Sequence, residues 1–202
     1  MGPMADGLLK GEREMQFSAR YSAAVAYAVR AHEGQVRKGT PHPYVAHPIA
    51  VSALVIEHGG TEDQAIAGLL HDVLEDCGEH HATEIEAQFG PGVIAIVRGM
   101  TDGLPDASGA KPPWKARKEA YVAHLAEAPD AVALVAAADK AHNAGAITAD
   151  HAAMGEAVFD KFTASSAETV WYYRSLARVL AERLGPDHRL VARLEREIVV
   201  WG

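Results

Sequence analysis

The sequence predicts an all-α fold, a single-domain helical bundle. Three observations support this class. Apolar residues recur at helical spacing in consecutive segments, and no run alternates polar and apolar residues for long. The composition is 49% hydrophobic but only 6% aromatic, so we expect a core of aliphatic side chains and alanines. A length of 202 residues is enough for one sizeable core and leaves little room for a second.

Helix-ending residues bound the first three predicted helices. Residues 18–34 end on a glycine, which is favoured just after a helix. Residues 47–60 open with a proline near the first turn and stop at a glycine pair. Residues 61–76 begin with Thr61, and Gln64 follows three positions later, which is the spacing of a capping box. We therefore expect one helix over 61–76.

Further helices are predicted along the rest of the chain. Thr83 and Glu86 repeat the capping-box spacing, so a helix is expected to start at Thr83. The β-branched residues in 91–101 would suit a strand. Glycine and proline bracket the segment, however, and its neighbours in the sequence are predicted helices, so a helix is favoured. Residues 102–113 are rich in glycine and proline and predict a loop. The remaining predicted helices are 114–128, 130–147, 157–162, 167–184 and 187–201.

Composition also limits the classes of function. The net charge of −8 disfavours a nucleic-acid binder, although a local basic cluster can still bind a small anion. The one cysteine, Cys77, excludes an internal disulfide framework and favours a cytoplasmic location. Residues 1–15 are expected to form a flexible leader without a signal sequence, and residues 16–202 the domain. No apolar run approaches the roughly 20 residues needed to span a membrane, so no membrane partner is expected.

One short stretch carries the strongest chemical signal. "LLHDVLED" places His71, Asp72, Glu75 and Asp76 in an otherwise apolar segment. Burial of carboxylates is costly unless a cation or hydrogen bonds compensate them. In a helix the first pair can bind a metal while the second lies one turn, roughly 6 Å, further along. The alternative is a solvated acidic face with a histidine in the core.

Two distant residues strengthen the metal hypothesis. His47 precedes a proline at the start of a predicted helix, although such a histidine is more often a capping or surface residue. Asp139 ends the apolar run "AVALVAAAD", where a lone carboxylate is unusual. The alternative for Asp139 is a buried ion pair with Lys140 or another base. Imidazoles and carboxylates without thiolates suit Mn, Fe, Ni or Zn.

The order H…HD…D resembles the signature of the HD phosphohydrolase superfamily. The blocks "AHEGQVRKGTPHPYVAHP", "LLHDVLEDC", "FGPGVIAIVRGMTDG", "WKARKEAYVAHL", "ADKAHNA" and "WYYRSLARVL" further resemble the SpoT-type alarmone hydrolase domain, from about residue 20 to 182. The resemblance implies a metal-dependent enzyme, usually with Mn2+. Its substrate would be a small nucleotide, guanosine tetra- or pentaphosphate, from which the 3′-pyrophosphate is removed.

Matching positions imply a role for each candidate residue. The metal ligands would be His47, His71, Asp72 and Asp139. Glu75 and Asp76 would orient and activate the attacking water. Arg37, Lys38 and Asn143 would bind the nucleotide and its phosphates. Attack on phosphorus requires such an activated water, and the departing pyrophosphate requires cations around it.

The chain departs from the family pattern after "DKAHNA", where Gly145 and Ala146 replace an arginine and a small residue. An adenosine alarmone, or another nucleotide with a 3′-pyrophosphate or a 3′-phosphate, therefore stays open as the substrate. So do a nucleotidase acting on another phosphate ester, a non-catalytic nucleotide-binding regulator and a di-iron oxygenase. His142 is interpreted as a helix-packing residue, and the basic segment "WKARK" as a second cluster that is more often solvated. The sequence gives no oligomeric state.

Overall fold

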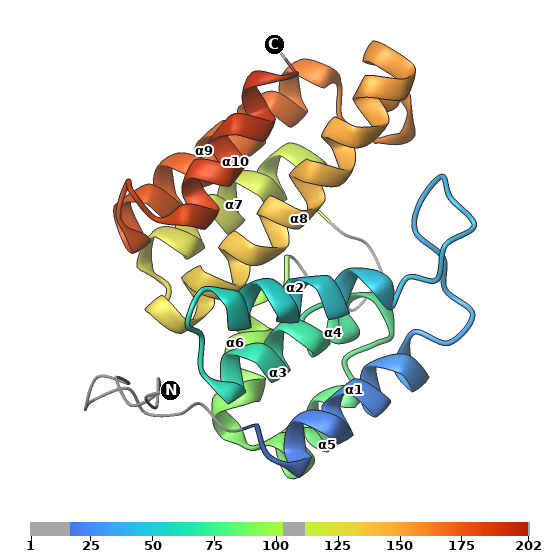
Figure 1. Ribbon diagram of the computed structural model, residues 1–202, viewed down its shortest axis with the longest axis vertical. Helices are drawn as coiled ribbons and strands as arrows, with labels where there is room; N and C mark the ends of the chain where they lie inside the picture. Colours follow the sequence, from blue (N-terminus) through green and yellow to red (C-terminus); the bar gives the residue numbers. More distant parts are fainter. Residues whose placement is uncertain (1–16, 103–111, 202) are drawn as a thin grey trace, which may run out of the picture.

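The computed structural model describes residues 17–102 and 112–201, and within them the all-α prediction is confirmed (Figure 1). The predicted leader, 1–15, and most of the predicted loop, 102–113, lie outside the described residues. The described part holds no strand, only an isolated bridge between Val36 and Pro43. The helices are α1 (Ala19–Ala31), α2 (Ala46–Glu57), α3 (Glu62–Leu70), α4 (Val73–Asp76), α5 (His81–Phe89), α6 (Pro91–Met100), α7 (Trp114–Glu127), α8 (Asp130–Met154), the 3-10 helix η1 (Gly155–Lys161), α9 (Ser166–Leu184) and α10 (Arg189–Val199).

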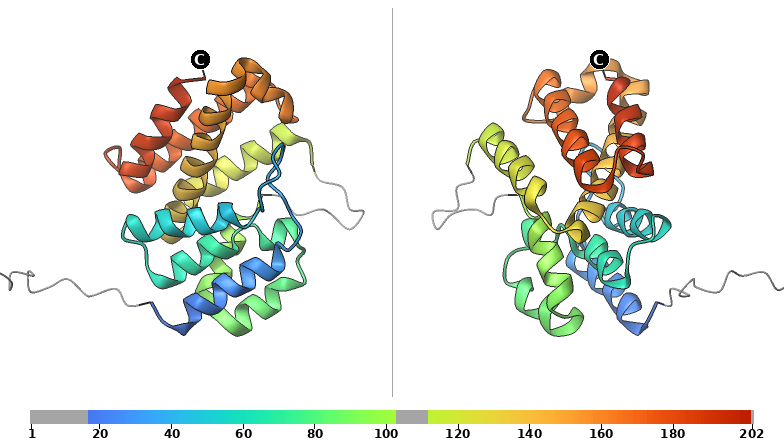
Figure 2. Two further views of the ribbon diagram at one scale, coloured as in Figure 1. Left: turned by 45° about the vertical axis from the view of Figure 1, so that its right-hand side comes forward. Right: turned by 90° about the vertical axis from the view of Figure 1, so that its left-hand side faces the viewer.

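Helix α8 is the central element of the fold. It packs against α2, α3 and α6 on one side and against α9 and α10 on the other, as Figures 1 and 2 show. Its inner face consists largely of small side chains; Ala133, Ala136, Ala141 and Ala144 are all fully buried. Small residues allow neighbouring helices to approach closely, and this close approach brings residues of α2 and α3 to the middle of α8.

Helices α2 and α3 lie unusually close together. A Cβ atom added at Gly68 would lie 3.1 Å from the Ser52 Cα atom and 3.3 Å from its backbone nitrogen. The Ser52 hydroxyl is also buried and donates to the Ala65 carbonyl at 2.8 Å. The absence of a side chain at position 68 therefore fixes how near the middle of α2, at Ser52, comes to the end of α3.

The structure corrects the expected single helix over 61–76. The capping box of Thr61 and Gln64 is present, but α3 ends at Leu70 and α4 begins at Val73. The His71 ring nitrogen Nδ1 lies 2.9 Å from the Gly68 carbonyl, the acceptor that the Asp72 amide would use in a continuous helix. A local side-chain bond of this kind competes with the helix and explains the break.

Two other predicted boundaries differ from the structure. Helix α5 begins at His81, so Thr83 lies inside it and the predicted capping box there is wrong. Residues 157–162 were expected to be α-helical, but they belong to the 3-10 helix η1 and its end. The helix over 91–101 is confirmed, with Pro91 in its first turn, where the missing amide hydrogen costs nothing. Within the described residues, none of the helices combines the length and hydropathy needed to cross a bilayer.

The segment between α1 and α2 is an ordered loop that returns on itself. The Arg37 amide donates to the His42 carbonyl at 2.9 Å, and the Tyr44 amide to the Gln35 carbonyl at 2.9 Å. Gly39 at the tip has φ +77° and lies against the Lys161 side chain of η1. These bonds hold Arg37 and Tyr44 on the same part of the loop, beside the first turn of α2.

Candidate metal site and cleft

Three buried side chains from three separate parts of the chain converge on one point. The ligand atoms of His47 (α2), His71 (directly after α3) and Asp139 (α8) lie within 4.8 Å of one another. The His47 Nε2 atom is 3.2 Å from Asp139 Oδ1, and the His71 Nε2 atom is 3.6 Å from it. Of the residues that the structure describes, these form the one group of His, Cys, Asp and Glu side chains with such spacing.

Asp72 lies at the edge of this group. Its Oδ2 atom is 3.0 Å from His71 Nε2 and 3.5 Å from His47 Nε2. The same oxygen accepts a hydrogen bond of 2.6 Å from the Tyr44 hydroxyl. Burial and the Asp72 carboxylate raise the pKa of Tyr44, so the phenol stays protonated and donates. Tyr44 was not identified from the sequence; its only sign there was its place in the "PHPYVAHP" block.

The arrangement of donors fits a divalent cation. Because His71 Nδ1 is directed at the Gly68 carbonyl, its tautomer leaves Nε2 free to act as a ligand. That Nε2 atom is buried and makes no hydrogen bond within the described structure. Its neighbours are the Asp72 and Asp139 carboxylates, whose contacts lack hydrogen-bond geometry, and a cation bonded to Nε2 would satisfy this buried polar atom. Nitrogen and oxygen donors without thiolate suit Mn, Fe, Zn or Ni.

Without a cation, protons stabilise the cluster. Burial alone would lower the pKa of His71, but Asp72 and Asp139 outweigh it and raise this pKa well above the usual value. Burial would likewise raise the pKa of Asp139. The Lys140 ammonium, 2.7 Å from its Oδ2 atom, and the two imidazoles instead hold that pKa well below its ordinary range. The cluster therefore combines ionised carboxylates with a protonated imidazole, a charge pattern that a metal ion can replace.

His47 has a second imidazole as its outer partner. Its Nδ1 atom lies 2.9 Å from the Nδ1 atom of His142, and the two ring centroids are 4.9 Å apart. Burial, with the charges of His47 and Arg37, lowers the pKa of His142 to about 4, so this ring is neutral near pH 7. His142 is thus more than the helix-packing residue expected from the sequence.

Glu75 and Asp76 follow the cluster on the short helix α4. The Asp76 amide bonds to the Asp72 carbonyl at 2.8 Å, so one helical turn separates Asp76 from Asp72 in spite of the break in the helix. Asp76 is exposed and Glu75 partly exposed. Desolvation and the carboxylates of Asp72 and Glu75 raise the pKa of Asp76, as expected for an acidic group that can take up a proton.

A cleft of about 580 Å³ opens beside the cluster. It combines cationic and aromatic side chains: the lining residues include Arg37, Lys38, Lys118, Lys140, Lys161, Trp114, Phe162, Tyr172, Tyr173, His142, Asn143 and Tyr44. Several of these touch the metal cluster directly, so the cleft and the cluster form one site.

The three candidate substrate residues all line this cleft. Asn143 donates to Asp139 Oδ1 at 2.6 Å and accepts from the Arg37 guanidinium at 3.0 Å. The Lys38 ammonium lies 5.8 Å from the centre of the Phe162 ring. The Arg37 guanidinium is 5.8 Å from the Tyr44 ring. The loop between α1 and α2 thus brings two cations to the carboxylate cluster.

The basic segment "WKARK" divides between two environments. Lys118 lines the cleft, and both Lys118 and Arg117 form ion pairs with Asp102. The Lys115 ammonium instead lies 3.9 Å from the Trp171 ring on the outside of α9. Only part of this segment therefore faces the cleft, and Lys118 contributes a further cation there.

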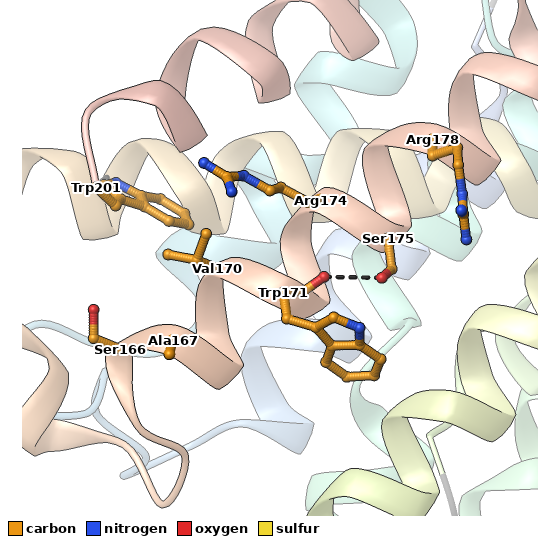
Figure 3. Close-up of a pocket in the computed structure, with 8 residues that line it drawn as sticks. All are labelled: Ser166, Ala167, Val170, Trp171, Arg174, Ser175, Arg178 and Trp201. Carbon is orange, nitrogen blue, oxygen red and sulfur yellow. Dashed lines mark hydrogen bonds between the residues drawn. The ribbon is translucent and has the colours of Figure 1, made fainter.

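A larger but more open hollow lies on the outer side of α9 (Figure 3). It is lined by Trp171 and Trp201 and by Arg174 and Arg178, and the Ser175 hydroxyl donates to the Trp171 carbonyl at 2.9 Å. No histidine or carboxylate lines this hollow. The histidine and carboxylate side chains of the candidate metal site lie beside the other cleft instead.

This all-α bundle with a His/Asp cluster is typical of HD metalloenzymes, and the chain belongs to the HD domain family, which it matches over residues 24–171. It is 34% identical over 129 residues to the guanosine-3′,5′-bis(diphosphate) 3′-pyrophosphohydrolase MESH1 of Drosophila melanogaster, covering 62% of this chain and 68% of that protein. The resemblance to this group of hydrolases is confirmed.

A bacterial relative and a solved structure agree with this. The guanosine-3′,5′-bis(diphosphate) 3′-pyrophosphohydrolase of Haemophilus influenzae is 32% identical over 164 residues, 78% of this chain and 21% of that protein. The chain thus spans about a fifth of the length of this relative. The solved structure of a metazoan ortholog of SpoT that hydrolyses ppGpp superposes with a TM-score of 0.72 at 25% identity, covering 93% of this chain and 98% of the other.

Proposed function

We propose that this protein is a metal-dependent phosphohydrolase that removes the 3′-pyrophosphate from guanosine tetra- and pentaphosphate or a close alarmone. One observation carries the proposal: the buried donors of His47, His71 and Asp139 adjoin a cleft that is lined by cations and aromatic rings. The MESH1 and SpoT-type relatives, whose names state this reaction, support the same substrate.

The proposed ligands are His47, His71, Asp72 and Asp139. When bound there, a divalent cation, Mn2+ in the proposal, supplies Lewis acidity and a nucleophile at neutral pH. Asp72 is held in place by the Tyr44 hydroxyl, and Asp139 by Asn143 and Lys140. Such outer contacts fix the direction of each ligand atom.

Glu75 and Asp76 are the proposed acid–base pair. Water attacks the phosphorus atom bonded to the ribose 3′-oxygen, and one of these carboxylates takes its proton. The bond between this phosphorus and the 3′-oxygen breaks, the 3′-oxygen gains a proton, and pyrophosphate leaves. Desolvation and the carboxylates of Asp72 and Glu75 raise the pKa of Asp76, which makes it a stronger proton acceptor than an ordinary aspartate.

The cleft supplies charge and ring surfaces for the nucleotide. Arg37, Lys38 and Asn143 are the proposed contacts to substrate, with Lys118 and Lys140 as additional cations. Cations around a phosphate chain stabilise the charge that develops during transfer. The Trp114 and Phe162 rings offer surfaces on which a base can stack.

A nucleotide panel with Mn2+, analysed by chromatography, tests the proposal. Guanosine tetraphosphate should give guanosine diphosphate and pyrophosphate, and the adenosine analogue tests selectivity for the base. Release of free phosphate instead would indicate a nucleotidase. Tight binding without product would indicate a regulator, and iron content near two per chain a di-iron enzyme. The Asp139→Ala variant controls for contaminating hydrolases.

The proposal has three finer parts. Mn2+ is tested by comparing the rate and metal content with Mn2+, Zn2+, Mg2+ and Fe2+. The cytoplasm is the proposed location, a reducing setting that suits the free thiol of Cys77. Residues 16–202 are proposed as one catalytic domain, which limited proteolysis followed by an activity measurement would test.

A further inference from the structure

The contact between His47 and His142 restricts where their protons lie. The two Nδ1 atoms are 2.9 Å apart, so one donates and the other accepts. A metal-binding histidine usually donates its second nitrogen to a carboxylate, a carbonyl or water. Here the partner is another imidazole. Which of the two Nδ1 atoms carries the proton therefore also decides whether the Nε2 atom of His142 is protonated.

Metal binding decides which of the two Nδ1 atoms donates the hydrogen bond. The His47 Nε2 atom faces the carboxylates of Asp139 and Asp72. To bind a metal it needs its lone pair, so the proton of a neutral His47 must lie on Nδ1. That N–H then donates to His142 Nδ1. A neutral His142 that accepts at Nδ1 carries its proton on Nε2.

The His142 ring belongs to the wall of the cleft. It is half-buried and lines the cleft together with Arg37, Asn143 and Lys140. With Nδ1 engaged by His47, the polar atom that remains to His142 is Nε2. An N–H donor among these cations suits an anionic oxygen.

We propose that His142 links the metal site to the substrate cleft: it accepts the His47 Nδ1–H bond in the metal-bound protein and thereby presents Nε2–H as a fixed donor to a phosphate oxygen of the substrate. His142 is a positioning residue toward His47 and a binding residue toward the substrate. The second role rests on the proposed function, whereas the first depends only on metal binding.

Two substitutions separate the roles. The Oδ1 atom of asparagine occupies nearly the position of histidine Nδ1, so His142→Asn keeps an acceptor for His47 and removes the Nε2 donor. His142→Phe keeps an aromatic ring but removes both the acceptor for His47 and the Nε2 donor. His142→Phe should weaken Mn2+ binding about 10- to 100-fold, the usual loss for an outer partner of a metal ligand. His142→Asn should bind Mn2+ like the wild type, and both variants should raise KM more than they lower kcat.

A matched control and an independent probe complete the design. His151→Phe alters another histidine of α8, one that contacts Glu156. It should change neither the Mn2+ affinity nor KM. Thermal unfolding followed by circular dichroism checks that each variant folds. Binding of inorganic pyrophosphate to the metal-loaded protein measures the donor without turnover, so it distinguishes failure of this inference from failure of the proposed reaction.

Nitrogen NMR tests the proton positions in the unaltered chain. Zn2+ replaces Mn2+ because Mn2+ is paramagnetic, and the His142 signals are assigned as those lost in His142→Asn. The expected spectrum has a protonated Nε2 and an unprotonated Nδ1 on His142. A proton on His142 Nδ1 in the metal-loaded protein would overturn the proposal, as would equal weakening of Mn2+ binding in the Asn and Phe variants.

Discussion

The Lys140 ammonium lies 2.7 Å from Asp139 Oδ2, while the other oxygen of the same carboxylate faces His47 and His71. An ion pair and a metal-ligand role were alternatives for Asp139 in the sequence. The structure makes them compatible, because the two oxygens face different partners. Lys140 thus compensates a buried carboxylate and still lines the cleft.

Lys140→Met should destabilise the metal-free protein more than the metal-loaded one. Removing one partner of a buried ion pair costs about 3–5 kcal/mol, and the Lys140 side chain is only 16% exposed. A bound cation should recover part of this loss, since it compensates Asp139 from the other side. Urea unfolding with and without Mn2+ measures both values, with Lys140→Arg as a control that keeps the charge. An equal loss in the two states would contradict the shared role of Asp139.

The proposed division between ligands and acid–base groups predicts two classes of variant. Asp139→Ala and Asp72→Ala should lose bound metal, because each removes a proposed donor. Glu75→Gln should keep the metal and lose roughly 10²- to 10⁴-fold in kcat, the usual contribution of a general base. Elemental analysis and steady-state kinetics on the same preparations test this. A fully active Glu75→Gln enzyme would refute the role of Glu75.

Metal binding should release a proton near pH 7. In the metal-free protein the pKa of His71 is raised well above its usual value, whereas the pKa of Asp139 is lowered. At pH 7 the imidazole is therefore protonated and the carboxylate ionised, and a metal must displace the proton on His71 Nε2. The apparent affinity should rise with pH until the raised pKa of His71 is passed. Titration calorimetry in buffers of different ionisation enthalpy counts the protons; no buffer dependence would contradict the protonated state.

Local sequence signals could predict the helices but not the interruption that shapes the site. Helical spacing and the Thr61 capping box indicate α3 correctly. Nothing in the apolar run shows that the His71 side chain takes the Gly68 carbonyl and ends the helix at Leu70. The Thr83 prediction was wrong because α5 already begins at His81, without a side-chain cap.

The proposed ligands could be found from residue type and order, whereas their partners could not. His71 and Asp139 stand in apolar runs, which a sequence shows directly, and His47 joined them through its place in the order H…HD…D. Tyr44 and His142 gain their roles from tertiary structure. The first reaches Asp72 because the loop before α2 returns on itself, and the second meets His47 because α2 packs on α8.

The close contact between α2 and α3 predicts opposite effects for two glycine substitutions. In Gly68→Ala the new Cβ would lie 3.1 Å from the Ser52 Cα, a backbone atom that can move only with its helix. We expect a loss of about 1–3 kcal/mol, as for overpacking. In Gly145→Ala, also within a helix, the nearest atom is Arg193 Nη2 at an ordinary 3.4 Å, so better helix propensity should stabilise by about 0.5–1 kcal/mol.

Metal affinity provides the second measurement for this pair. Gly68 brings α2 and α3 together; His47 lies in α2, His71 directly follows α3, and the Gly68 carbonyl fixes the His71 ring. Separation of the helices by a few tenths of an ångström should therefore weaken Mn2+ binding in Gly68→Ala and leave it unchanged in Gly145→Ala. Thermal unfolding and metal titration on both variants test the argument. A Gly68→Ala protein with wild-type stability and affinity would show that α2 can move without disturbing the metal site.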